Sequence, residues 1–184
     1  MKKLLFLAAV ASMGLCVACD SSDNEGETTT FDYLQSDFTL QLSDDLFALV
    51  DLTITYDDPA VEGDGETETL TAVKWNKAFK TTTFPASYSF KIEAAMKEGV
   101  TLDKSNYALS YEVTTLFEEY RSNGKVKWKE GPDSERQAVV LQPDAANPDQ
   151  LKTKIEEFIT NMNLLLVYTI RQEADGGFDV EDNI

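Results

Sequence analysis

Apolar and polar side chains alternate through most of the chain from Phe31 onward. The clearest stretch runs from Tyr88 to Met96, in which every second residue is apolar. Successive side chains of a β-strand point to opposite faces, so a period of two is typical of strands that bury one face and expose the other. The chain is therefore expected to fold mainly into half-buried β-strands.

Turn-forming residues divide this alternation into about eight or nine short strands. We expect Trp75 to fall at a break between two of them. The final strand is apolar on both faces, which predicts a central position in its sheet or a place beneath a helix. The expected strands cover residues 38–42, 46–56, 67–74, 77–84, 88–96, 107–120, 126–130, 138–141 and 164–170.

The Asn-Gly pair at 123–124 is the strongest hairpin signal in the chain. Both residue types tolerate the positive φ that a two-residue type I′ turn requires. Such a turn would pair Glu118 with Lys129 and Tyr120 with Lys127 on adjacent strands. The first of these pairs is opposite in charge, which favours the register modestly.

One segment follows a helical period instead. Asn147 is a good N-cap, Pro148 suits the first helical position and Gln150 completes a capping box. The sequence therefore predicts a helix over 148–161, and the whole pattern favours an antiparallel β-sandwich with this helix over an open end or face. A β-barrel is the alternative, although no regular strand spacing marks one. The apolar residues on one face of the helix are Leu151, Ile155, Phe158, Ile159 and Met162.

The start of the chain has a different composition. Lys2 and Lys3 precede an apolar run from Leu4 to Leu15. This run is shorter than the ~20 apolar residues that span a bilayer. A positive start, a short apolar run and small residues after it are typical of a secretory signal peptide, which we assign to residues 1–18.

The small residues lead directly into a cysteine, in the order Cys16-Val17-Ala18-Cys19. This order resembles the lipobox of bacterial lipoproteins, although Cys16 stands where the family generally has Leu. The resemblance implies cleavage before Cys19 and attachment of diacylglycerol to its thiol. The alternative is an ordinary secretory signal that leaves Cys19 as a free thiol.

The acidic, polar residues 19–30 cannot bury enough apolar surface to fold, so we expect a flexible tether. They also resemble the acidic export signal that follows the lipidated cysteine in surface lipoproteins of Bacteroidetes. Residues 31–172 are then expected to form one β-sandwich domain, and 173–184 a frayed acidic tail.

The charge balance narrows the range of partners. The chain has 16 basic and 33 acidic residues, which gives a net charge of −17. Nucleic acids and anionic lipid headgroups are bound by clustered Lys and Arg, so this excess of acid argues against both. The simplest interpretation is a well-solvated surface.

Cysteine and histidine limit the chemistry further. The only cysteines are Cys16 and Cys19, and there is no histidine. This removes the nucleophile systems that depend on His, and it removes the His and Cys ligands of zinc and copper sites. The acidic turn at 62–66 does not have the spacing of an EF-hand loop. We expect no metal and no cofactor.

Aromatic residues are the main candidates for a binding site. Trp75 and Trp128, with Tyr120 or Tyr111, could form an exposed platform on which sugar rings stack. The alternative is that these rings close the ends of the β core, since Trp and Tyr bury a large area while keeping a polar group in water. Adjacent acidic residues on a strand point to opposite faces, so none of the acidic pairs is itself a glycosidase dyad.

The sequence thus predicts a lipid-anchored, non-enzymatic binding or accessory module of the outer membrane, exposed at the cell surface or, alternatively, facing the periplasm. Its partners would be the membrane, through Cys19, and a glycan or another envelope protein. One rival hypothesis is a structural subunit or anchor of a surface filament assembled by strand addition, which requires an unpaired edge or a displaceable terminal strand. A carboxylate-dependent glycoside hydrolase is the less favoured rival.

Overall fold

The computed structural model describes residues 29–58, 65–144, 147 and 149–183. The predicted signal peptide, Cys19 and most of the predicted tether lie outside these residues. Neither of the helices in the described part is long and apolar enough to cross a membrane. In chain order the elements are β1 (Phe31–Leu42), α1 (Asp44–Leu49), β2 (Val50–Tyr56), β3 (Glu66–Thr69), β4 (Lys74–Thr81), β5 (Ala86–Met96), β6 (Tyr107–Arg121), β7 (Val126–Leu141), α2 (Asp149–Thr160), β8 (Leu164–Gln172) and β9 (Phe178–Asn183).

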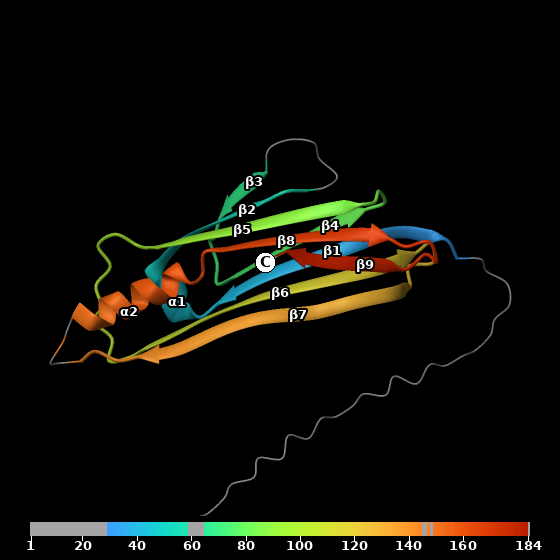
Figure 1. Ribbon diagram of the computed structural model, residues 1–184. Helices are drawn as coiled ribbons and strands as arrows, with labels where there is room; N and C mark the ends of the chain where they lie inside the picture. The colour runs from blue at the N-terminus through green and yellow to red at the C-terminus, as the bar shows by residue number, and fades with distance from the viewer. Residues whose placement is uncertain (1–28, 59–64, 145–146, 148, 184) are drawn as a thin grey trace, which may run out of the picture.

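The strands form two antiparallel sheets. One has four strands in the order β4-β1-β6-β7, and the other has five in the order β3-β2-β5-β8-β9. The sheets lie against each other and do not close into a barrel (Figure 1), so the predicted β-sandwich is confirmed. The chain crosses from one sheet to the other several times, and each sheet therefore depends on segments far apart in the sequence.

A cluster of aromatic rings fills the space between the sheets. The centroid of the Phe38 ring in β1 lies 3.8 Å from that of Phe90 in β5 and 5.8 Å from that of Tyr88. All of these side chains are buried, and aromatic pairs of this kind contribute ~0.5–1.5 kcal/mol beyond the area they bury. Three further buried rings lie at 5.8 to 6.0 Å from Phe38, namely those of Tyr168, Phe79 and Phe117.

Helix α2 closes one end of the sandwich, where α1 also lies (Figure 1). It covers 149–160, which confirms the predicted helix, and Gln150 N–H donates to the carbonyl of Asn147 at 3.1 Å. Pro148 lies outside the described residues. The apolar face of α2 is buried as expected, and its Phe158 packs edge-on against Tyr111 of β6 with ring centroids 5.9 Å apart.

The strand predicted over 46–56 is wrong in its first part, because 44–49 form helix α1. The Ser43 hydroxyl caps this helix by accepting the N–H of Leu46 at 3.3 Å. Leu46, Ala48 and Val50 alternate as in a strand, but the buried residues of α1 are Leu46 and Leu49, and a spacing of three places both on one face of a helix. Asp45 then ties α1 to β6 by accepting the N–H of Ala108 at 2.8 Å.

The two strands predicted at 126–130 and 138–141 are one strand, β7. The register against β6 shifts between the pairs Thr115–Asp133 and Phe117–Glu130, so Gly131 and Pro132 are accommodated in a bulge instead of ending the strand. Gly131 has φ +89°, and a Cβ there would lie 2.7 Å from the carbonyl oxygen of Thr115.

The predicted hairpin forms, with a different turn. Glu118 pairs with Lys129 as expected, and their side chains form an ion pair at 3.2 Å. Tyr120, however, pairs with Val126 and not with Lys127. A type I′ turn needs positive φ at both Asn and Gly, but in the described residues only glycines, here Gly124 at +76°, have positive φ. Arg121 N–H donates to the carbonyl of Lys125 at 2.9 Å, so beyond this pair the connection is the three residues 122–124, and the register shifts by one residue.

Three further boundaries differ from the prediction. β1 begins at Phe31 and not at 38. The sequence pattern did not show this start because Ser36, a polar residue, takes a fully buried position and so interrupts the alternation. Trp75 lies inside β4, paired with Leu40, and not at a strand break. Residues 178–183 of the predicted tail form β9, which pairs with β8 because Phe178 is buried at the end of the core.

Replacing Gly131 with Ala should destabilise the protein more than replacing Gly124 with Ala. Both glycines have positive φ, but a Cβ at Gly124 meets no atom within 4 Å. We expect Gly124→Ala to cost about 1 kcal/mol from backbone conformation alone. Gly131→Ala should cost about 3 kcal/mol or more, because the steric conflict with Thr115 is added. Urea unfolding of the two variants would measure this, and equal losses would contradict the bulge geometry.

Candidate functional site

The structure does not bring the three predicted stacking residues together. Trp75 lies in β4 and Trp128 in β7, the two edge strands of the four-stranded sheet, whereas Tyr120 lies in β6 between them. Both tryptophans are half-buried and pack against the core. Tyr111, the alternative partner, is only 1% exposed and cannot belong to a surface platform.

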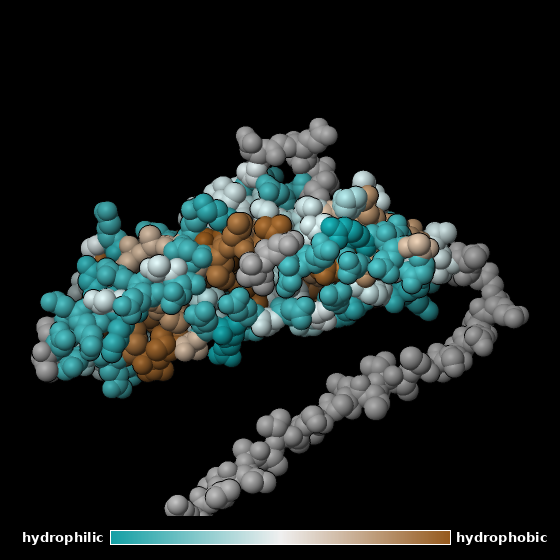
Figure 2. Space-filling model, in the orientation of Figure 1, coloured by the Kyte–Doolittle hydropathy of each residue, from teal (hydrophilic) through white to brown (hydrophobic). Residues whose placement is uncertain are grey.

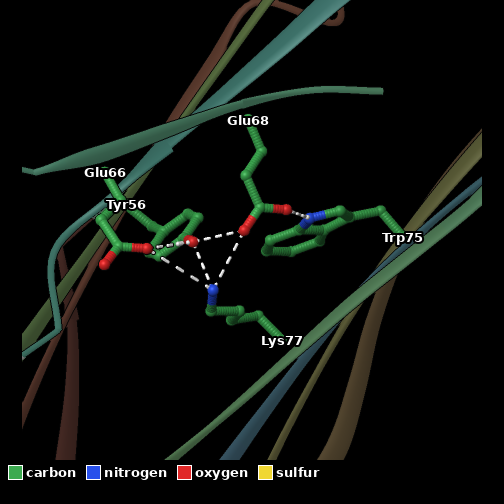
Figure 3. Close-up of polar contacts among 5 residues, drawn as sticks. All are labelled: Tyr56, Glu66, Glu68, Trp75 and Lys77. Carbon is green, nitrogen blue, oxygen red and sulfur yellow. Dashed lines mark hydrogen bonds and ion pairs between the residues drawn. The ribbon is translucent and has the colours of Figure 1, made fainter. Parts of the chain in front are cut away.

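Trp75 belongs to a polar group that joins the edges of the two sheets, which we call the β3–β4 cluster: Tyr56, Glu66, Glu68, Trp75 and Lys77 (Figure 3). The indole Nε1–H of Trp75 donates to Glu68 Oε2 at 2.8 Å, and Lys77 Nζ donates to Glu68 Oε1 at 3.0 Å. The Tyr56 hydroxyl contacts Glu66 Oε2 at 2.7 Å and also contacts Glu68 and Lys77. Lys77 in β4 is thereby linked to both glutamates of β3.

Three ionisable groups of the β3–β4 cluster, Tyr56, Glu68 and Lys77, are held in their ordinary charge states. Hydrogen bonds from Tyr56, Trp75 and Lys77 lower the pKa of Glu68 to about 2. Burial, together with hydrogen bonds to the two glutamates, raises the pKa of Tyr56 to about 12. The hydrogen bonds to Tyr56 and Glu68 raise the pKa of Lys77. None of these three groups changes charge near neutral pH, so the arrangement is suited to linking the sheets and not to proton transfer.

Trp128 closes the other edge of the core. Its ring lies 5.5 Å from that of Phe178 in β9, and Phe178 in turn lies 5.0 Å from Phe84 and 5.9 Å from Phe31. This packing supports the interpretation that the tryptophans bury aromatic area at the margins of the core. Trp128 is thus a half-buried ring whose described aromatic contact is with Phe178.

Tyr120 differs from the tryptophans because it lies on the outer face of the four-stranded sheet, with its neighbour Glu119 facing inward and buried. Its ring stacks on that of Tyr33 in β1, with centroids 4.9 Å apart and planes inclined by 18°. Lys80 Nζ lies 4.1 Å from the centroid of the Tyr33 ring. We call Tyr33, Tyr120 and Lys80 the tyrosine platform.

The polar neighbours of the platform fix the orientation of Tyr120. Its hydroxyl donates to Glu118 Oε2 at 3.0 Å, and this hydrogen bond raises the pKa of Tyr120. Glu118 also pairs with Lys129. Tyr33 is covered by Lys80 and Tyr120, and among the described residues no other ring or cation lies over Tyr120. Tyr33 thus packs on one face of the Tyr120 ring, and the Tyr120 side chain is half-buried.

Tyr33 was not among the sequence-based candidates, although the sequence contains a signal for it. Leu34, Phe38 and Leu40 occupy one set of alternate positions and are buried, so Tyr33 falls in the outward-facing set. An aromatic residue in the outward set of a strand is a candidate for a surface site. The signal was missed because the predicted strand began only at 38.

The side of the molecule seen in Figure 2 is mainly hydrophilic, with hydrophobic side chains visible in a few areas between polar ones. Among the described residues, no three His, Cys, Asp or Glu side chains are placed to hold a metal ion. Comparison of the sequence with protein-family models and with curated proteins gives no match.

Replacing Glu68 with Gln tests the β3–β4 cluster. Because the pKa of Glu68 is about 2 in the folded protein and ~4.3 in an unfolded chain, the ionised carboxylate stabilises the fold above about pH 4.3, and this contribution is lost as the pH falls toward 2. Glu68 is partly exposed, so we expect a loss of about 1 kcal/mol in the free energy of unfolding at neutral pH.

The wild type and Glu68→Gln should approach the same stability near pH 2. Urea unfolding across this pH range measures the difference. Glu98→Gln, in the exposed turn after β5, is the control and should behave as wild type throughout. A Glu68→Gln variant that matches wild type at neutral pH would show that the cluster does not stabilise the fold.

Proposed function

We propose that the protein is a lipid-anchored binding module of a bacterial cell envelope, exposed at the cell surface, and that its ligand is a glycan that stacks on Tyr120. The observation that carries the ligand class is the tyrosine platform. Sugar rings have apolar faces that pack on aromatic rings and hydroxyl groups that need polar partners. The platform supplies both, since the Tyr120 hydroxyl is bonded to Glu118, Glu118 is paired with Lys129, and Lys80 lies over Tyr33.

The platform is also ordered before a ligand arrives. Tyr120 is held by the stack on Tyr33 and by the hydrogen bond to Glu118. Tyr33 lies on β1 and Glu118 on β6, and these two strands are paired in one sheet. Rings that are already fixed lose little conformational entropy on binding. This favours a binding role for the outer face of the sheet.

The platform predicts a distinct order among three variants. Tyr120→Ala should lower the affinity for a glycan identified on an array by about tenfold or more, because the stacking surface is removed. Tyr33→Ala should weaken binding less, because it removes only the support behind Tyr120. Tyr120→Phe should bind nearly as wild type, because the ring remains. Isothermal titration measures all three, and binding that survives Tyr120→Ala would contradict the proposal.

The lipid anchor is supported by the sequence, through the resemblance of residues 16–19 to a lipobox. We expect the wild-type protein to fractionate with membranes and to be removed from intact cells by added protease. Cys19→Ala should be released into the soluble fraction because no acyl chain can be attached. A Cys19→Ala protein that stays on the membrane, or a wild-type protein that resists protease on intact cells, would contradict the anchor or the surface location respectively.

A second candidate function is a subunit of a surface filament assembled by strand addition. It is favoured by one observation, that β9 lies at a sheet edge and, among the described strands, pairs with β8 alone. An edge strand can be displaced by a strand from another molecule with less disruption of the sheet than a central one.

A further inference from the structure

The sandwich has two open sides, and they differ in charge. On one side the edge strands β3 and β4 are joined by Lys77, which contacts both Glu66 and Glu68. On the other side the edge strands β7 and β9 enclose a cleft of about 250 Å³, which we call the β7–β9 cleft. Its inner walls come from β6 and β8 and include Val113, Leu166 and Tyr168. The cleft is thus an opening into the core and not a shallow surface depression.

The rim of the β7–β9 cleft carries negative charge without a matching cation. Asp133 and Glu135 of β7 and Asp182 of β9 line it. In the described part of the chain, none of these three carboxylates forms an ion pair with a Lys or Arg. Nearby Glu130 is partly buried and faces Asp133, Asp179 and Asp182, and burial together with these charges raises its pKa. The cleft therefore suits a cationic group on an apolar stem.

The same side of the sandwich offers backbone hydrogen bonds. Residues 133–141 of β7 pair without interruption with 107–115 of β6, and no described strand lies on the other side of β7. The outward-pointing N–H and C=O groups of this segment can accept a further strand. The bulge at Gly131-Pro132 limits where such a strand can pair, because it lies directly before this segment.

We propose that an extended segment of a partner protein adds to β7 along 133–141 and places a Lys or Arg side chain in the β7–β9 cleft. The backbone supplies the pairing, and Asp133, Glu135 and Asp182 select the charge of the side chain that enters. A second copy of this chain does not fit the role, because a protein with a net charge of −17 meets repulsion at an acidic edge. The inference does not depend on glycan binding. It shares with the second candidate function the pairing of a strand from another molecule with a sheet edge.

The test uses the full-length mature protein and two synthetic peptides of about nine residues, matched in length to the free segment of β7. Both alternate Thr and Val, and they differ only in a central Lys or Glu. Isothermal titration measures affinity, and amide hydrogen exchange locates the bound strand. We expect the Lys peptide to bind and to slow exchange within 133–141. We expect no binding of the Glu peptide.

The triple variant Asp133→Asn, Glu135→Gln, Asp182→Asn should weaken binding of the Lys peptide by about tenfold or more. The matched control removes the same number of charges from exposed positions elsewhere, as Asp51→Asn, Glu98→Gln, Asp103→Asn, and should bind as wild type. The inference would be overturned if the Lys peptide did not bind at about 1 mM or if the Glu peptide bound equally well. It would also be overturned if the control variant lost as much affinity as the triple variant, or if hydrogen exchange slowed only outside β7.

Discussion

The packing of Phe38 against rings from both sheets is the interaction on which the rest of the structure depends. Phe38 belongs to β1 of the four-stranded sheet, and the rings of Tyr88, Phe90 and Tyr168 reach it from the five-stranded sheet. The described domain contains no cysteine, so no disulfide joins the sheets and this apolar contact has to hold them. Burial of apolar area, aromatic and aliphatic, is the largest favourable contribution available to such a fold.

Because most aromatic residues are packed in the core or at its edges, few aromatic rings remain on the surface where a ligand could reach them. Trp75 and Trp128 close the two edges, one by a hydrogen bond to Glu68 and the other by packing on Phe178. Tyr33 and Tyr120 are left on the outer face, where they stack on each other. The two edges then differ, since the one at Trp75 carries a bridging lysine and the one at Trp128 borders an acidic cleft.

Alternation and capping signals were sufficient to predict the fold class, the helix at 149–160 and the long strands β5 and β6. They failed where a local pattern fits two kinds of secondary structure, or where contacts between distant segments determine the local structure. The apolar residues of 46–50 alternate as in a strand although 44–49 form a helix, and the Gly131-Pro132 pair is typical of a strand end although a bulge accommodates it. Tyr120 was predicted as a site residue and lies on the surface, but its stacking partner depends on β1 and β6 being neighbours, which sequence cannot show.

The central functional claim is that the outer-face tyrosines, and not the tryptophans, meet the ligand. Nuclear magnetic resonance of the protein labelled on its tyrosine and tryptophan rings, titrated with a glycan that binds, tests this most directly. The account predicts that the ring signals of Tyr120 and Tyr33 shift on titration and that those of Trp75 and Trp128 do not. Shifts confined to the tryptophan rings, with the two tyrosines unchanged, would contradict it.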